Sequence, residues 1–324
     1  MSAQLRDEPD TLAVLIQQVA DTAGVRASFV EKDFWAIEVL RAARMTRAIR
    51  LKDDAGIGEV TMLFKGGTSL SRAFGLVQRF SEDVDLLAVF PEGTSPAARH
   101  IVLKQVDEDV TAHLGIPGVL VPGSSDTGVK RYTTYAYPAS HPDSDLTTGV
   151  LLELGSRGGT HPSVQVSVRS MLADVAIEQL GVGDGEWAEF APFEANVLAP
   201  ERTLLEKLSA LHTAATTDDP RLAGMGRHLY DVHQLLGSDR VLGALQKLGR
   251  AGVVELSADV HAHSREAGFD YVERPESGYA SSAAFTLENA GVAAAYARVS
   301  VLVYGPVPTL GDVLARIQER TDLL

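Results

Sequence analysis

The spacing of apolar side chains predicts two helices and then the first strands of a sheet. Between Asp10 and Leu40 apolar residues recur at helical spacing, with a break near Gly24. The segment "EVTMLFKGG" predicts a short buried strand that ends in a glycine pair, followed by a helix, "TSLSRAFGL", capped by Thr68. "SEDVDLLAVF" then alternates polar and apolar residues with the period of a strand.

In the rest of the chain, the pattern of apolar residues changes from strand-like to helical near residue 200. "HIVLKQVDEDVTAHLG" predicts a helix, and the Val-, Thr- and Tyr-rich residues that follow predict several strands of one sheet. After Pro200, segments such as "ERTLLEKLSALHTAA", "RHLYDVHQLL" and "AGVAAAYARVSVLVYG" carry the 3.6-residue period of helices. The sequence therefore predicts an α+β, bilobed protein: residues 1–195 form a mixed β-sheet lobe with N-terminal covering helices, and residues 196–324 form a mostly α-helical lobe.

Composition narrows the class of protein. The 324 residues are 45% hydrophobic and 22% charged, as in soluble globular proteins. No apolar run reaches the roughly 18 residues that span a bilayer, and "MSAQLRDEPD" lacks a signal peptide's pattern, so we expect a cytoplasmic protein without membrane contact. The absence of cysteine excludes disulfides, zinc–thiolate sites and thiol nucleophiles. The net charge of −14 weakly opposes nucleic-acid binding, although a local basic groove is compatible with it.

The stretch "LFKGGTSLSRAFGLVQRFSEDVDLLAVF" carries the main candidate chemistry. Asp83 and Asp85 lie two residues apart on a predicted strand, so their carboxylates face the same side and repel each other. Two Mg²⁺ ions would relieve that repulsion and hold the phosphates of a nucleotide. The small residues before them allow the backbone to approach phosphates and supply N–H and hydroxyl donors; they are Gly66, Gly67, Thr68 and Ser69.

A third carboxylate is usual in a two-metal site, and Glu153 is the candidate because it interrupts an apolar run on a predicted central strand. The alternative is a structural glutamate paired with a cation. Arg157 and Arg169 are candidates either for that cation or for phosphate contacts.

The helical lobe contributes two further candidates. Lys207 lies at the edge of an apolar stripe, where it either binds a triphosphate or snorkels to the surface. Asp231 and Arg227 are one helical turn apart, which suits either a simple ion pair or a role in which Asp231 orients Lys207 or nucleotide and Arg227 lies beside phosphate. His228 and His233 are five residues apart and no HExxH motif is present, so a catalytic zinc is not expected. Ser81 precedes Asp83 by two residues, where phosphorylation would repel an incoming triphosphate.

Glycine pair, short helix and Asp-x-Asp occur in the order of the nucleotidyltransferase signature. Together with "EKDFW", "ERTLLEKLSAL" and "RHLYDVHQLL", the stretch resembles the landmarks of the AbiEii/AbiGii family of nucleotidyltransferase-like toxins, which includes the MenT toxins, over roughly Ser28 to Leu236. The resemblance implies a nucleotidyltransferase-type mixed sheet, a helical lobe and an active site between them. It also assigns roles: Asp83 and Asp85 as metal-binding carboxylates, Lys207 and Asp231 as the lysine and aspartate of later motifs. The small residues of the first motif correspond to Gly66, Gly67, Ser69 and Ser81.

The resemblance further implies a Mg²⁺-dependent, NTP-consuming nucleotidyltransferase toxin of a toxin–antitoxin system. The expected acceptor is RNA, in the MenT branch the 3′ end of tRNA, so that translation and growth are inhibited until a cognate antitoxin intervenes. Two alternatives remain open from the sequence. In the first, the acceptor is a small molecule or a protein hydroxyl, which the charge of −14 slightly favours. In the second, the protein is a catalytically silent nucleotide-binding module that acts through partner contacts.

Overall fold

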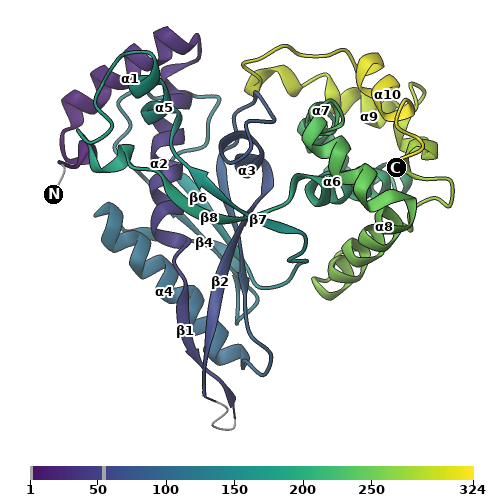
Figure 1. Ribbon diagram of the computed structural model, residues 1–324, viewed down its shortest axis with the longest axis horizontal. Coiled ribbons are helices and arrows are strands. Elements are labelled where there is room, and N and C mark those ends of the chain that lie inside the picture. Colours follow the sequence, from purple (N-terminus) through teal and green to yellow (C-terminus); the bar gives the residue numbers. More distant parts are fainter. Residues whose placement is uncertain (1–2, 53–55) are drawn as a thin grey trace. The chain divides into compact units, whose positions relative to one another are not determined.

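The computed structural model describes residues 3–52 and 56–324, and the chain forms two compact units. Unit 1 consists of Met1–Ala73, Ser81–Ser156 and Ser163–Val197. Unit 2 consists of Phe74–Phe80, Arg157–Pro162 and Leu198–Leu324. Unit 1 holds the sheet and unit 2 the C-terminal helices, so the fold is α+β (Figure 1). Within the described residues, no helix has the length and apolar character needed to cross a membrane.

Unit 1 is built on a mixed sheet of eight strands in the described part of the chain. The strands are β1 (Arg47–Arg50), β2 (Ile57–Lys65), β3 (Asp83–Val89), β4 (Gly118–Asp126), β5 (Lys130–Tyr135), β6 (Val150–Gly155), β7 (Ser163–Val168) and β8 (Phe193–Leu198). Their order is β4-β5-β6-β3-β2-β8-β7, with β1 paired to β2. The pairs β3–β6 and β2–β8 are parallel, whereas β2–β3 and β5–β6 are antiparallel. β3, which begins with Asp83, is therefore a central strand with neighbours on both sides.

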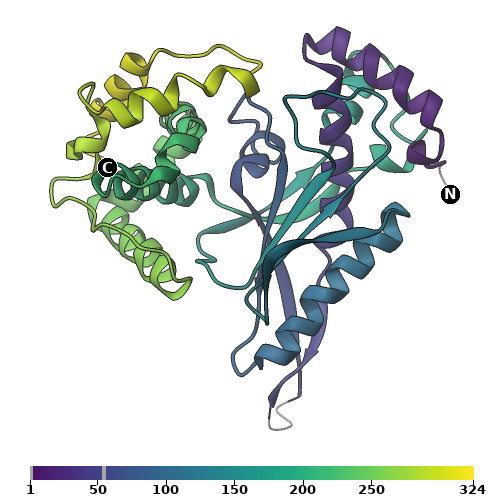
Figure 2. The ribbon, with the colours of Figure 1, turned by 180° about the vertical axis from the view of Figure 1, so that it is seen from behind.

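Helices cover one face of this sheet. They are α1 (Pro9–Ala23), α2 (Ala27–Ala43), α4 (Pro96–Leu114) and α5 (Met171–Glu178), and the short α3 (Gly66–Arg72) follows β2. α2 packs against β3 and β6, α4 packs against β4 and β5, and α1 and α5 pack against α2 (Figure 1; Figure 2). Alternate strand residues such as Phe64, Val84 and Leu152 are fully buried. Because α2 is covered on several sides, it is buried almost all round, as a central helix should be.

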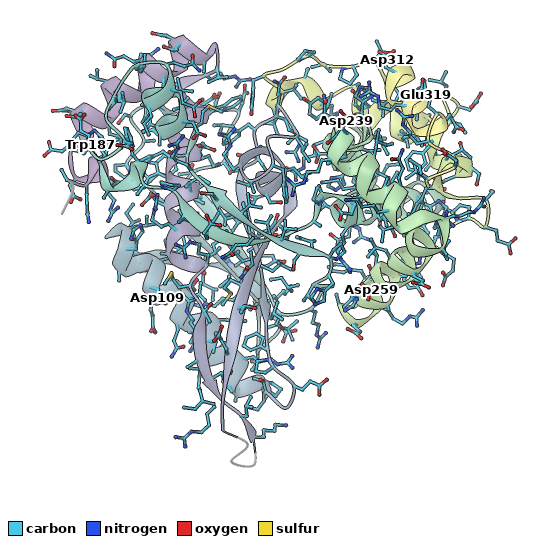
Figure 3. All side chains as sticks on the ribbon, viewed as in Figure 1. Asp109, Trp187, Asp239, Asp259, Asp312 and Glu319 are labelled. Carbon is cyan, nitrogen blue, oxygen red and sulfur yellow. The ribbon has the colours of Figure 1, made fainter. Side chains whose placement is uncertain are left out.

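Unit 2 is helical. Its helices are α6 (Pro200–Thr216), α7 (Gly226–Leu236), α8 (Asp239–Glu266), α9 (Ala290–Tyr296) and α10 (Leu310–Gln318). α6 packs against α7 and α8, and α7 packs against α9 and α10. The buried Arg202 of α6 pairs with Asp259 of α8, Nη1 to Oδ2 2.6 Å, and Asp312 closes a capping box at the start of α10. Asp259 and Asp312 are labelled in Figure 3.

The helix predicted across residues 290–305 is wrong in its second half. α9 ends at Tyr296, and a 3₁₀ turn, Val299–Leu302, follows. The segment after it pairs with residues 78–80: Phe80 N–H donates to the Leu302 carbonyl at 2.8 Å, and Tyr304 N–H donates to the Gln78 carbonyl at 3.1 Å. Tertiary hydrogen bonds to a distant segment therefore override the local helical period.

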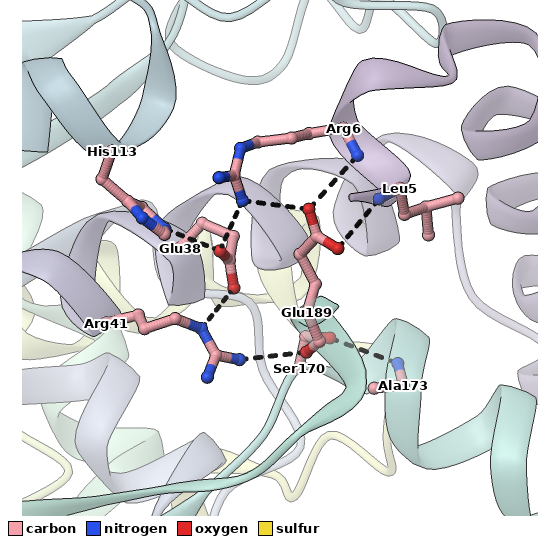
Figure 4. A network of polar contacts seen from close by, with 8 residues as sticks. All are labelled: Leu5, Arg6, Glu38, Arg41, His113, Ser170, Ala173 and Glu189. Carbon is pink, nitrogen blue, oxygen red and sulfur yellow. Dashed lines mark hydrogen bonds and ion pairs between the residues drawn. The ribbon is translucent and has the colours of Figure 1, made fainter. Parts of the chain in front are cut away.

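A buried ionic network fastens the N-terminal residues to unit 1 (Figure 4). The Glu189 carboxylate accepts from Leu5 N–H at 2.9 Å and from Arg6 Nη1 at 3.0 Å. Arg6 also reaches Glu38, which accepts from Arg41 Nε at 2.8 Å and lies 2.8 Å from His113 Nε2. Glu38 and Glu189 are 1% and 2% exposed, so each carboxylate depends on these partners to offset its desolvation.

Glu189→Ala should lower the free energy of unfolding by about 3–5 kcal/mol, because it leaves Arg6 and two backbone N–H groups without their acceptor. Thermal unfolding measures the loss, and amide exchange at Leu5 should accelerate. Glu178→Ala is the matched control, since the Glu178 side chain is 64% exposed. Equal melting temperatures for the two variants would contradict the role given to Glu189.

Candidate active site

The sheet brings four polar residues into one row across neighbouring strands. Lys65 of β2 pairs with Asp85 of β3, Asp85 with Glu153 of β6, and Glu153 with Tyr132 of β5. Directly paired residues point to the same face, and Asp83 shares it because it lies two residues from Asp85. The adjacent residues Val84, Leu86, Leu152 and Leu154 are buried toward the other face. Two of the three candidate carboxylates thus lie side by side, and the third is on the same strand as Asp85.

Gly66 makes room for Asp85. Its φ is +76°, a backbone conformation that residues other than glycine adopt only at a cost in energy. A Cβ built there would lie 2.0 Å from Asp85 Oδ2. The Asp85 carboxylate therefore rests directly against the Gly66 backbone. The first glycine of the motif is required at this position both by conformation and by space.

The residues after the glycines serve the turn itself. α3 begins at Gly66, so the predicted helix start with Thr68 as its cap is wrong. Thr68 Oγ1 donates instead to the Asp83 carbonyl at 2.5 Å, and Ser69 Oγ donates to the Gly66 carbonyl at 2.9 Å. Thr68 is 4% exposed and Ser69 is fully buried. These hydroxyls tie α3 to the start of β3.

Burial and neighbouring charges act strongly on Glu153. Desolvation, followed by the negative charges of Asp85 and Asp83, raises the pKa of Glu153 to about 8, against a smaller opposing effect of Lys65. Burial and the carboxylates of Glu153 and Asp85 also raise the pKa of Tyr132, so its phenol stays protonated. Carboxylate crowding of this kind favours a divalent cation, whose preferred ligands are oxygen atoms. Among the described residues, no three His, Asp or Glu side chains form a preformed metal cage.

Neither arginine proposed as a partner of Glu153 takes that role. Arg169 pairs with Asp174 at 2.6 Å and with Glu178 at 3.2 Å. Arg157 Nη1 donates to the Glu266 carbonyl at 3.2 Å. The positive charge that acts on Glu153 comes from Lys65, on a strand two positions away in the sheet. Lys65 and Tyr132 are site residues that sequence reasoning missed, and only the strand order could have revealed them.

In unit 2, Asp231 of α7 is fully buried between two cations. Arg79 binds it with two hydrogen bonds, Nε to Oδ1 at 2.6 Å and Nη2 to Oδ2 at 2.7 Å, and Lys207 Nζ lies 2.9 Å from Oδ2. Burial would raise the pKa of Asp231, but the charges of Arg79 and Lys207 hold it well below its usual range. Asp231 thus contacts Lys207, the lysine that one of the two sequence-based alternatives has it orient. The simple ion pair with Arg227 is replaced by the bidentate contact with Arg79, which is 152 residues away in sequence.

His228 completes this cluster. Lys207 Nζ lies 3.2 Å from His228 Nδ1, which acts as acceptor because the lysine ammonium has only donors. Burial and the nearby charge of Lys207 lower the pKa of His228 well below its usual value, so the imidazole is neutral. Burial likewise lowers the pKa of Lys207, while Asp231 opposes the shift. The two buried cations against one carboxylate give the cluster a net positive charge, with the half-buried Arg227 adding to it.

Replacing Glu153 by Gln should change the pH dependence of stability. The pKa of Glu153 is raised in the folded state, so between about pH 4.5 and pH 8 the folded protein holds a proton that the unfolded chain has released. The free energy of unfolding therefore falls as the pH rises through this range. Glu153→Gln should equal wild type near pH 5 and exceed it by about 1–2 kcal/mol at pH 9, allowing for solvent screening. Urea unfolding in chelator measures both, with Glu59→Gln as the exposed control. An unchanged difference across this range would contradict the assignment.

Asp231→Asn should destabilise the protein by about 3–5 kcal/mol, because it leaves Arg79 and Lys207 buried without their counter-charge. Asp239→Asn, at an exposed position in the first turn of α8, should cost less than about 1 kcal/mol. Thermal unfolding compares the two, and a similar small loss in both would show that the Asp231 charge is unimportant.

Comparison with known proteins places the chain in a family. No curated protein matches the chain. A solved structure, JHP933 from Helicobacter pylori, is 15% identical, and the alignment covers 89% of this chain and 87% of that chain with a TM-score of 0.37. The model of the family described as nucleotidyl transferase AbiEii toxin, type IV toxin–antitoxin system, matches residues 51–282, well over half of the chain. The chain therefore belongs to the AbiEii nucleotidyltransferase toxins.

Proposed function

We propose that this toxin transfers a nucleotide from an NTP to an RNA acceptor, the 3′ end of tRNA, and so inhibits translation until its antitoxin neutralises it. The observation that carries the proposal is the alignment of Asp85 with Glu153 on adjacent strands, with Asp83 two residues before Asp85. Carboxylate oxygens are the ligands that hard divalent cations such as Mg²⁺ prefer.

In this proposal Asp83, Asp85 and Glu153 hold Mg²⁺, most simply as two ions. Their oxygen donors fit that cation, and burial together with the charges of Asp85 and Asp83 raises the pKa of Glu153, a shift that a bound cation would oppose. Bound Mg²⁺ would polarise the α-phosphate and neutralise charge that develops on the leaving pyrophosphate. The acceptor hydroxyl would attack that phosphate, the bond between the α- and β-phosphates would break to release pyrophosphate, and the hydroxyl proton would pass to water.

Lys207 is the proposed triphosphate contact. Asp231 and His228 use two of its three N–H donors, and among the described residues the third has no partner. Lys207 is 7% exposed, so the cluster offers a restricted, positively charged donor to a phosphate oxygen. Asp231 contacts Lys207 rather than solvent, and we assign it to orienting that lysine. Arg227 adds positive charge for the same phosphates.

The first motif supplies the proposed nucleotide cradle. We assign Gly66 and Gly67, at the end of β2, to backbone contacts with a phosphate held beside Asp85. Thr68 and Ser69 act through the turn that their hydroxyls hold. Ser81 is half-buried before β3, and its phosphorylation would set negative charge beside the incoming triphosphate.

The net charge of −14 slightly favours a second candidate acceptor, a small molecule or a protein hydroxyl. The two candidates differ in salt dependence, because a polyanionic acceptor releases counterions on binding. A steep loss of acceptor affinity with rising salt supports RNA, whereas a flat response supports the second candidate.

Incubation with total cellular RNA and each labelled NTP in turn tests the proposal. Wild type should label a tRNA-sized band, and Asp85→Asn should reduce labelling by at least about 100-fold, because a metal-holding charge is lost. Asp126→Asn, at the exposed end of β4, should label normally. Absence of labelling by wild type with every NTP, or full activity of Asp85→Asn, would refute the proposed reaction.

A further inference from the structure

α2 carries three consecutive charged residues that the proposed reaction does not use. Glu31, Lys32 and Asp33 are 1%, 0% and 7% exposed. Charged residues are rarely buried unless they are paired, and consecutive helical residues point about 100° apart. Each of the three must therefore satisfy its charge against a different part of unit 1.

Lys32 has the most complete set of contacts. Its Nζ donates to Glu82 Oε1 at 3.0 Å, to the Thr147 carbonyl at 2.7 Å and to Thr147 Oγ1 at 2.7 Å. These contacts use all three ammonium donors. Glu82 and Thr147 are also joined directly, because Glu82 Oε1 accepts from Thr147 N–H at 2.7 Å and from its hydroxyl at 2.8 Å.

The positions of these two partners in the chain give the contact its meaning. Glu82 immediately precedes Asp83, the first residue of β3. Thr147 lies three residues before Val150, where β6 begins, and six before Glu153. One buried ammonium thus joins the segments that lead into the two strands carrying all three candidate metal ligands.

The flanking residues fasten the surroundings. Glu31 accepts from Ser140 N–H at 2.7 Å and from His141 N–H at 2.9 Å, which holds the loop before β6. Asp33 accepts from Met171 N–H at 2.6 Å and lies 3.3 Å from Nε of Arg72, the last residue of α3. All of these contacts start from α2.

We propose that Lys32 is a positioning residue that fixes the starts of β3 and β6 relative to each other, and so sets the spacing of the carboxylates for divalent-cation binding. The inference rests on the proposed function, since it assigns Lys32 to that metal site. Asp83 is the terminal residue of its strand, where the hydrogen-bond ladder ends and local opening is easiest. The contacts of Lys32 with Glu82 and Thr147 therefore restrain Asp83 at a strand end, where strand hydrogen bonds give less restraint.

Stability alone explains this arrangement poorly. A buried ion pair is often no more stabilising than apolar residues of similar volume, and setting a register is the better-attested use of buried charge. Replacing a residue that orients metal ligands without touching the metal commonly weakens metal binding by about 10- to 100-fold.

Titration of metal-free protein with Mn²⁺, followed by electron paramagnetic resonance, tests the inference without requiring turnover. Lys32→Met should weaken Mn²⁺ binding at least about tenfold. Lys32→Met/Glu82→Gln removes both charges, so it should recover stability yet still bind Mn²⁺ weakly. Arg47→Met is the matched control, because it removes a cation that is 8% exposed and paired with Asp109 on α4, with no contact to Glu82 or Thr147.

The outcomes separate the two claims. Wild-type binding that is lost in Asp85→Asn, weak in both Lys32 variants and normal in Arg47→Met supports the inference. Wild-type affinity in the double variant, with binding still lost in Asp85→Asn, would overturn the inference and leave the proposed function intact. No Mn²⁺ binding by wild type, with or without NTP, would refute the proposed metal site and the inference with it.

Discussion

Crowding of like charges on one sheet face is the constraint around which unit 1 is organised. Asp85 and Glu153 are directly paired on adjacent parallel strands, and Asp83 is two residues from Asp85. Burial, followed by the negative charges of Asp85 and Asp83, raises the pKa of Glu153 to about 8. Two neighbouring residues accommodate this arrangement. Gly66 has no side chain and so leaves room for Asp85, and the Thr68 hydroxyl donates to the Asp83 carbonyl.

Buried positive charge is used in two different ways in the molecule. Lys32 is saturated by Glu82 and Thr147 and has no donor left for a ligand, which suits a structural lock. Lys207 shares its carboxylate with Arg79 and retains a donor without a partner among the described residues, which suits a substrate contact. The two lysines thus differ in the number of satisfied N–H groups, which is why we propose different roles for them.

Connectivity links the chemistry of the first motif to unit 2. Residues 74–80 follow α3 and precede β3, yet they belong to unit 2, where Arg79 binds Asp231 and Phe80 bonds Leu302. Arg79 lies four residues before Asp83 in the sequence. The residues that lead into β3 therefore include one, Arg79, whose side chain is held within unit 2.

The sequence by itself determined the α+β class, the glycine turn, the strand of Asp83 and Asp85, and Glu153 as the third carboxylate candidate, because periodicity and i,i+2 geometry are local properties. The tertiary structure alone decided which charges meet. It paired Asp231 with Arg79 instead of Arg227, gave Arg157 and Arg169 other partners than Glu153, and placed Lys65 and Tyr132 in the carboxylate row. These outcomes depend on strand order and burial, which bring together residues up to 152 positions apart and leave no periodic trace along the chain.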